Sequence, residues 1–286
     1  MAGWVLGVGA VAIAVGLTAA SAKLARKRLQ RARADHRNRP ALWNRFYAID
    51  WGETATNNYG FAPADGDHPQ RFQHQMYREM LELLQQKRPL TSELRLLEVS
   101  CGRGGGLNAL LDASGSKLSA TGLDVAASAI AYCRRAYDRP NLDFVEGSAT
   151  DLPFGDASFD VVLNVEASND YEDRQRFFRE VARVLKPDGI FLYTDSFKTP
   201  QIDQMQRDLF KAGFEAEFTD VTKNVIEACR ADTPRRREVV RRYAPLAARM
   251  LLGKSLANYA AMEGSTKFNA FVTGKRTYLM TAATRR

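Results

Sequence analysis

The stretch LRLLEVSCGRGGG, residues 94–106, decides the predicted fold. Its first six residues are mostly leucine and valine with one acid, Glu98, and they predict a short buried strand. The glycines of residues 102–106 then predict a tight loop, and residues 107–111 have helical character. Glycine permits positive φ angles and close approach of a ligand, and the start of a helix offers free N–H groups. The stretch therefore predicts a strand, a ligand-binding loop and a helix.

A second acid distinguishes between the ligands that such a loop can bind. A dinucleotide-binding loop reads G-x-G-x-x-G, with an acid about twenty residues later. Here the loop reads GRGGG, Glu98 precedes it, and Asp124 ends the next apolar stretch, residues 118–123. An acid after the first strand suits a cationic amino-acid group, and an acid after the second suits two ribose hydroxyls. This pair predicts S-adenosylmethionine (SAM) as the cofactor.

Length and charge favour one large domain with additions. The chain has 286 residues and a formal net charge of +8, but eight basic residues lie within residues 23–39 alone. The excess charge therefore does not by itself indicate nucleic acid, and we expect no such partner. The three cysteines (Cys101, Cys133 and Cys229) lie far apart without metal-ligand spacing, so we expect free thiols and no metal site.

The amino-terminal segment is apolar. Residues 4–22 carry no charge, and as a helix they would span roughly 28 Å, close to the thickness of the hydrocarbon core. They predict a single-pass transmembrane anchor at residues 1–22, with a cleaved signal peptide or a buried helix as the alternatives. Because the basic cluster follows the anchor, the positive-inside rule places the rest of the chain on the cytoplasmic side of the membrane. Small residues in the segment would permit a homodimer, namely Gly3, Gly7, Gly9 and Gly16.

The remainder of the chain divides into a linker and a main domain. Residues 23–64 predict a basic juxtamembrane segment followed by an aromatic linker or lid, and residues 65–286 predict the main domain. Within the main domain, apolar strands alternate with helices, which predicts a parallel, doubly wound α/β sheet. Ligands of such sheets bind at the carboxyl ends of the strands. The predicted strands are 94–99, 119–124, 142–145, 160–165 and 190–194, and the predicted helices are 70–86, 126–137 and 174–185.

Several motifs of this domain resemble class I SAM-dependent methyltransferases over about residues 65–284. They are LEVSCGRGGG, TGLDV, LDFVEGSATDLPF, SFDVVLNVEAS and FFREVARVLKPDG. More narrowly, the chain is similar to the phthiotriol and phenolphthiotriol dimycocerosates methyltransferases, which O-methylate a very hydrophobic lipid alcohol, and to the sterol and tocopherol methyltransferase branch. The resemblance implies a Rossmann-like seven-stranded sheet with helices on both faces. Its last two strands would form an antiparallel pair at residues 215–221 and 278–284.

The resemblance also implies roles for individual residues in binding SAM, whose product is S-adenosylhomocysteine. Glu98 and the glycine loop would hold the methionine part, Asp124 the ribose and Val125 the adenine. The residues expected to bind the cofactor are Glu98, Ser100, Gly102, Gly104, Asp124, Val125, Ser148, Ala149 and Asn164. The chain departs from the family at Ser148, where Asp is common, but a hydroxyl can still form a hydrogen bond there.

A second departure concerns the catalytic base. The lipid branch often has histidine where this chain has Asn169, and asparagine cannot take a proton at neutral pH. If a base is needed, the candidates are Asp170, Glu166, His74 or a tyrosine such as Tyr171. An alcohol benefits from a base, whereas a carboxylate or an amine needs little or none.

The combined expectation is a membrane-anchored SAM-dependent methyltransferase acting on a hydrophobic small molecule or lipid. O-methylation of a hydroxyl or carboxyl is the leading hypothesis, and C- or N-methylation of a sterol-like, terpenoid or amine substrate is the alternative. Residues 222–274 predict helices that form a lid over the substrate, with ordinary packing helices as the alternative reading. A scaffold without catalysis is disfavoured by Glu98, the glycine loop and Asp124. A nucleic-acid methyltransferase is disfavoured because no N/D-P-P-Y or catalytic-cysteine motif follows residues 160–165.

Overall fold

The computed structural model describes residues 39–286, apart from residues 91–92, 116–117 and 245. The predicted anchor at residues 1–22, and the basic segment that follows it, lie outside the described residues. Within the described ranges, no helix is both long enough and apolar enough to cross a membrane.

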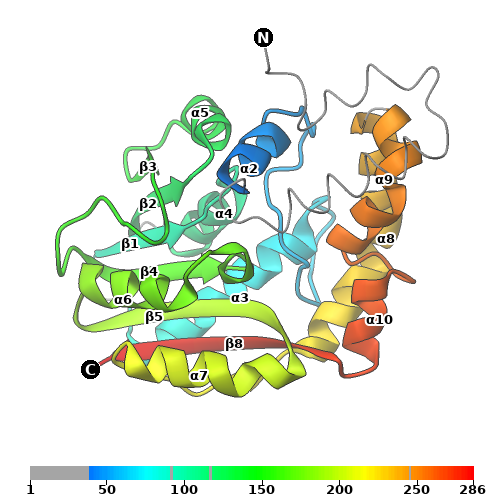
Figure 1. Ribbon diagram of the computed structural model, residues 1–286. Helices are drawn as coiled ribbons and strands as arrows, with labels where there is room; N and C mark the ends of the chain where they lie inside the picture. Colours follow the sequence, from blue (N-terminus) through cyan, green and yellow to red (C-terminus); the bar gives the residue numbers. More distant parts are fainter. Residues whose placement is uncertain (1–38, 91–92, 116–117, 245) are drawn as a thin grey trace, which may run out of the picture.

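A single mixed sheet forms the centre of the described chain (Figure 1). Its strands lie in the order β3-β2-β1-β4-β5-β8-β6, and β7 also pairs with β8. Strands β1 to β5 are parallel, whereas β8 runs antiparallel to β5. The strands are β1 (Leu94–Val99), β2 (Leu118–Asp124), β3 (Leu142–Glu146), β4 (Phe159–Val165), β5 (Leu185–Lys198), β6 (Phe214–Glu215), β7 (Thr219–Asp220) and β8 (Arg276–Arg285).

The predicted strand count needs one correction. The sheet contains eight strands among the described residues, because the predicted strand 215–221 forms as two separate two-residue strands, β6 and β7. Each of them pairs antiparallel with β8 over only two residues. The predicted antiparallel edge is therefore present, but its outer strand is interrupted.

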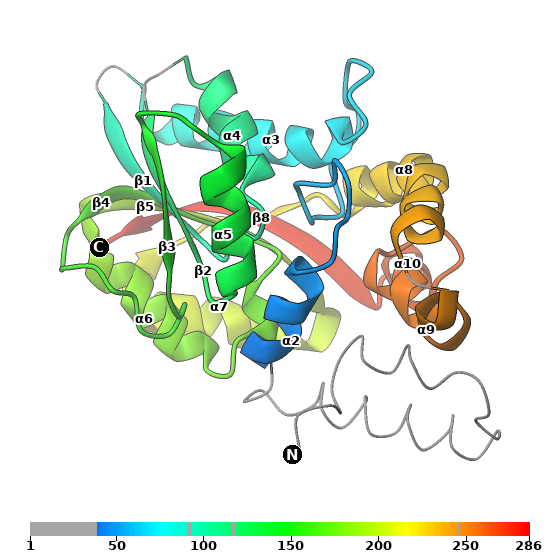
Figure 2. The same ribbon diagram turned by 90° about the horizontal axis from the view of Figure 1, so that it is seen from above.

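Helices cover both faces of the sheet, and each face has its own hydrophobic core. Leu96 and Val161 point into the core beneath α3, α4 and α5, whereas Leu97 and Val162 point into the core beneath α6 and α7. Alternate residues of β1 and β4 thus face opposite sides, as strand geometry requires. Figure 2 shows these two helical layers on either side of the sheet. The helices are α3 (Arg71–Lys87), α4 (Gly105–Ala113), α5 (Ala127–Ala136), α6 (Arg174–Val184) and α7 (Ile202–Lys211).

Two further groups of helices lie beyond the carboxyl ends of the strands. Helix α2 (Arg39–Tyr47) precedes the sheet in sequence, and α8 (Thr222–Tyr243), α9 (Leu246–Tyr259) and α10 (Thr266–Val272) are inserted between β7 and β8. Figures 1 and 2 both place α2 between the sheet and the inserted helices. The helices expected at residues 222–274 are therefore present. Their position allows them to close the end of the sheet where a ligand binds.

Candidate active site

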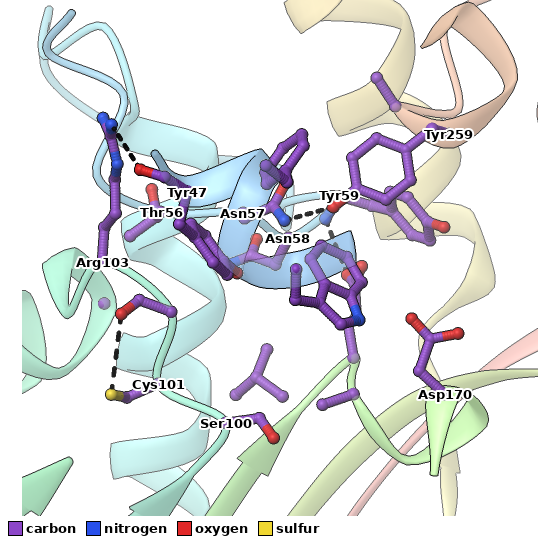
Figure 3. A pocket seen from close by; sticks show the side chains of 18 of the residues that line it. Tyr47, Thr56, Asn57, Asn58, Tyr59, Ser100, Cys101, Arg103, Asp170 and Tyr259 are labelled. Carbon is purple, nitrogen blue, oxygen red and sulfur yellow. Dashed lines mark hydrogen bonds between the residues drawn. The ribbon is translucent and has the colours of Figure 1, made fainter. Parts of the chain in front are cut away.

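A cavity of about 440 Å³ lies at the carboxyl ends of the parallel strands. This volume is typical of a small-molecule site. The wall is formed mainly by the loops after β1, β2, β3 and β4, the segment of residues 39–59 and the inserted helices, and α3, β5 and β8 also contribute to it. Figure 3 shows side chains from these parts converging on the cavity. Of the predicted site residues, those that line it are Ser100, Gly102, Asp124, Val125, Ser148, Ala149, Glu166, Asp170 and Tyr171.

The glycine loop adopts the conformation that its composition predicts. Gly102 and Gly104 have φ angles of 56° and 72°, which favour glycine. At Gly106, an added Cβ would lie only 1.9 Å from Cζ of Tyr77. The glycines therefore serve both backbone geometry and close packing. Gly104 itself does not line the cavity, because its Cα faces the rings of Phe144 and Tyr137.

Glu98 lies just behind the cavity wall and is 1% exposed. The hydroxyl of Tyr77 donates a 2.7 Å hydrogen bond to its Oε1. Its Oε2 is buried and has no hydrogen-bond partner within the described chain. Burial raises the pKa of Glu98 to about 8. A buried carboxylate oxygen without a donor is what a cationic ligand group would satisfy.

Asp124 joins the glycine loop to the end of β2. Its Oδ2 accepts a 2.9 Å hydrogen bond from the amide of Gly102, and its Oδ1 accepts one of 2.9 Å from the amide of Ala126. Burial raises its pKa, although these backbone donors oppose that effect. Asp124 lines the cavity, as do Val125, Ser148 and Ala149.

Asn164 is buried behind the cavity wall and does not line the cavity. Its Nδ2 donates to the carbonyl of Val99 at 2.9 Å and to the hydroxyl of Tyr171 at 2.8 Å. Tyr171 in turn hydrogen-bonds the hydroxyl of Ser100 at 2.7 Å. Asn164 is thus linked to Ser100 only through Tyr171, and its contact with a cofactor stays a prediction. Burial also raises the pKa of Tyr171, which keeps its hydroxyl protonated and makes it unsuitable as a base.

The predicted catalytic candidates lie in different places. Glu166 lines the cavity, and its Oε1 accepts 2.7 Å hydrogen bonds from the amide of Tyr59 and the hydroxyl of Tyr278. Burial raises its pKa to about 7. Asp170 also lines the cavity, but it forms an ion pair with Arg39 at the start of α2. Glu166 is thus positioned to exchange a proton near neutral pH.

His74 does not line the cavity, contrary to the expectation that it could reach the site. Its ring stacks on His68, with 4.4 Å between the ring centroids. Burial and the charge of His68 lower its pKa to about 4. Helix periodicity explains the error, because Gln73 and Tyr77 occupy the face of α3 that lines the cavity, and His74 is turned away from it.

Arg103 fixes the aromatic segment over the glycine loop. Its Nη2 donates to the carbonyl of Ile49 at 2.6 Å, and longer contacts of 3.4 Å reach the carbonyls of Tyr47 and Thr54. Asn57 then joins this segment to α9 by a hydrogen bond to the hydroxyl of Tyr259 (Figure 3). Residues 39–59 therefore contribute to the cavity wall, and their role as a lid stays a prediction.

Sequence reasoning missed many polar cavity residues, among them Tyr59, Lys267 and Arg276. Tyr59 lies in the segment predicted as an aromatic linker or lid, and the other two lie in or after the long insert. Lys267 lies within hydrogen-bond distance of the hydroxyl of Tyr59, and Arg276 lines the same cavity. The sequence carries no spacing signal that relates Lys267 to Tyr59, 208 positions earlier.

The central part of the chain matches a known family. Residues 97–193 match the methyltransferase domain family. The chain contains a methyltransferase domain. The predicted resemblance to class I SAM-dependent methyltransferases is thereby confirmed for this domain.

The chain also has curated relatives that are methyltransferases. The chain is 42% identical over 153 residues to "Probable phthiotriol/phenolphthiotriol dimycocerosates methyltransferase 2" of Mycobacterium ulcerans, covering 53% of this chain and 59% of the relative. It is 47% identical over 118 residues to "Fatty-acid O-methyltransferase" of Mycolicibacterium smegmatis, covering 41% and 43%. The chain thus spans less than two thirds of the length of either relative.

A solved structure shows the same fold. It is the structure of a putative sarcosine dimethylglycine methyltransferase from Galdieria sulphuraria, with a TM-score of 0.66 and 19% identity, covering 85% of this chain and 97% of that one. The prediction of a Rossmann-like methyltransferase sheet with helices is therefore confirmed.

The cavity of the methyltransferase domain fits SAM as its cofactor. Glu98 offers an unpartnered buried oxygen for the ammonium group, and Gly102 and Gly106 of the glycine loop line the cavity. Asp124 has acceptor capacity for ribose hydroxyls. The identification of the domain and this donor set agree with SAM, although the individual roles of these residues remain predictions.

Proposed function

We propose that the chain is a SAM-dependent O-methyltransferase whose substrate is a lipid-like molecule with a hydroxyl or a carboxyl group. The observation that carries this proposal is the composition of the cavity. The glycine loop joined to Asp124 lines the cavity, and Glu98 lies behind Tyr77. The aromatic segment of residues 39–59 packs on this loop and also lines the cavity. An aromatic wall suits an apolar substrate. The names of the two relatives, which act on lipid-like molecules, support the same substrate class.

The cofactor supplies an activated methyl group on a sulfonium, and the protein mainly aligns it with the attacking atom. Such alignment can contribute about 7–11 kcal/mol to the lowering of the barrier. Glu98 and the glycine loop hold one end of the cavity, and the lid excludes water from it. Lid closure relies on Arg103 and on the ion pair between Arg39 and Asp170.

Glu166 is the residue that takes a proton when the substrate is an alcohol. It lines the cavity, and its pKa of about 7 lies near the working pH, where a general base is most effective. The amide of Tyr59 and the hydroxyl of Tyr278 orient the carboxylate and stabilise its charged form. Asp170 is a weaker candidate because Arg39 already neutralises it.

Membrane attachment is a separate part of the proposal. The support is the apolar sequence of residues 4–22 and an exposed apolar surface on α9, where Leu246 is 64% exposed and Met250 is 75% exposed. Arg241 and Arg242, at the end of the preceding helix, are exposed and carry the charge that anionic headgroups attract. In this arrangement the catalytic domain lies on the cytoplasmic side and takes its substrate from the bilayer. A homodimer through the small residues of the anchor stays a prediction.

An extract assay tests the proposed function. The full-length protein is incubated with methyl-labelled SAM and a total lipid extract, and parallel samples contain RNA or DNA. We expect label in the organic phase, and we expect Asp124→Asn to reduce it at least about tenfold, because the charged acceptor for the ribose is lost. Label on nucleic acid, or full activity in Asp124→Asn, would contradict the proposal.

A further inference from the structure

Lys267 and Arg276 line the cavity without a carboxylate partner among the described residues, as does Arg103, whose guanidinium is bound by the carbonyls of the lid. Lys267 comes from α10 and Arg276 from the start of β8, and both contribute to the cavity wall. Within the described part of the chain, neither has a carboxylate oxygen within 4.0 Å, although most of the other buried or half-buried arginines near them do. Two cations at one end of a cavity without a paired anion repel each other. They therefore favour an anionic ligand.

The hydrogen bonds of these two cations leave donors free. Nζ of Lys267 donates to the hydroxyl of Tyr59 at 2.6 Å. Nη2 of Arg276 donates to the carbonyl of Ser196 at 2.7 Å and to its hydroxyl at 3.0 Å. Nε of Arg276 is buried and has no partner among the described residues. An ammonium has three donors and a guanidinium has five, so several remain for a ligand.

The acids of the same region already have donors of their own. Asp195 accepts hydrogen bonds of 2.7 Å from the hydroxyl of Ser168, from the side-chain amide of Asn169 and from the amide of Ser196. Glu166 accepts two from Tyr59 and Tyr278. Asp170, the third acid of this region, is paired with Arg39. Burial raises the pKa of both Glu166 and Asp195.

We propose that Lys267 and Arg276 bind the carboxylate of a long-chain carboxylic acid, which makes the reaction the formation of a methyl ester. This inference rests on the proposed function and names its substrate class. A neutral alcohol would leave both cations uncompensated, and an amine would be repelled by them. A single carboxylate, with two oxygens, can accept from both side chains at once.

The chemistry of this reaction explains the absence of a histidine base. A carboxylate oxygen attacks the methyl carbon, a new C–O bond forms, the C–S bond breaks, and its electron pair remains on the sulfur. No proton has to be removed, so Asn169 in place of histidine costs nothing. The ester is neutral, so it is no longer attracted to the charges of Lys267 and Arg276. It should therefore dissociate from the cavity more readily than the carboxylate does.

A matched set of ligands tests this proposal without any variant. Dodecanoic acid, dodecan-1-ol and dodecyl phosphate share one chain length and differ in the head group. We expect the full-length protein to methylate the acid at least about 10-fold more efficiently than the alcohol, because a charge-assisted pair adds 1.5–3 kcal/mol. Equal or greater methylation of the alcohol would overturn the proposal, as would tighter binding of the phosphate than of the acid.

Variants then assign the effect to the two cations. We expect Lys267→Met and Arg276→Met to raise KM for dodecanoic acid at least about 10-fold, while the Kd for S-adenosylhomocysteine stays within about twofold. Lys267→Arg should restore most of the affinity, and Lys275→Met is the control because Lys275 is exposed and outside the cavity wall. An unchanged KM in folded Lys267→Met and Arg276→Met protein would overturn the assignment.

Binding separates failure of this inference from failure of the proposed function. If no lipid is methylated, the proposed function fails, and calorimetry with dodecanoate and S-adenosylhomocysteine still reports on the anion site. Dodecanoate binding that is lost in Lys267→Met supports the site. Binding of the alcohol as tight as that of the acid refutes it. If a variant does not fold, the preference of the unmodified protein for acid, alcohol or phosphate decides the question.

Discussion

Replacing Glu98 by glutamine should stabilise the ligand-free protein at alkaline pH and weaken its cofactor binding. Glu98 is almost fully buried, and burial raises its pKa to about 8 from a usual value of 4.5. Between these two pH values the folded state holds a proton that the unfolded state has released. The free energy of unfolding contributed by this group is therefore fully present below pH 4.5 and falls as the pH rises to about 8. Glutamine carries no charge and removes this pH dependence.

The size of the effect follows from the pKa difference. A difference of about 3.5 between the folded and unfolded pKa values corresponds to an upper limit of roughly 5 kcal/mol at 1.36 kcal/mol per pKa unit. We expect Glu98→Gln to raise the free energy of unfolding by about 2–5 kcal/mol at pH 9 and by less than about 1 kcal/mol at pH 5. The pKa of Glu166 is also raised, to about 7, so Glu166 makes the stability depend on pH in the same direction. Because Glu166 is present in both the Glu98→Gln and the unmodified protein, the difference between their stabilities reports on Glu98.

Chemical denaturation at pH 5, 7 and 9 measures this difference, and calorimetry with S-adenosylhomocysteine measures the cost to binding. We expect the Kd to rise about 10–100-fold at pH 7, because the buried oxygen no longer pairs with a cationic group. Glu82→Gln is the matched control, since Glu82 is exposed on α3 and should change neither quantity. Parallel pH dependence in the Glu98→Gln and unmodified proteins would show that Glu98 is not a buried, high-pKa carboxyl.

Three further perturbations test the loop, the lid and the excluded histidine. Gly106→Ala places a Cβ 1.9 Å from Cζ of Tyr77 and should lower the free energy of unfolding, measured by urea denaturation, by about 1–3 kcal/mol. Gly155→Ala is the control and should change this free energy little, because the nearest atom to its added Cβ is 3.6 Å away. Arg103→Met removes three contacts to lid carbonyls and should speed limited proteolysis within residues 39–59 about tenfold; an unchanged cleavage rate would mean that other contacts hold the lid. His74→Ala should keep kcat/KM within about twofold, and a loss of 100-fold or more would restore His74 as a base.

Local sequence signals predicted much of the fold because the strands and helices of the sheet have clear periodicity. The expected strands at residues 94–99 and 160–165 are present as β1 and within β4, and the expected helix at 70–86 is α3 with its bounds shifted by one residue. The prediction of one outer strand at residues 215–221 was less accurate, because two short strands form there. The register of these strands depends on pairing with β8, about sixty positions later, and the local pattern does not contain that information.

The residues of the site likewise fall into those that local sequence could predict and those that depend on tertiary packing. The glycine loop, Glu98 and Asp124 could be predicted because a strand end, a loop and the next strand end are close in sequence and their chemistry is set by residue type. Glu166 lies at the end of β4 for the same reason. His74 could not be excluded in advance, because a helix position predicts a face only when the neighbours of each face are known.

The sequence by itself determined a parallel α/β sheet with a glycine loop between two acids, because these features arise from periodicity and backbone freedom over a few residues. Only the tertiary structure decided which polar groups share the cavity. Lys267 meets Tyr59 and shares a wall with Arg276 because the inserted helices fold back over the ends of the strands. Long-range packing decides whether a cationic side chain pairs with a carboxylate of the protein. A paired cation forms a structural ion pair, whereas an unpaired one can bind an anionic group of a substrate.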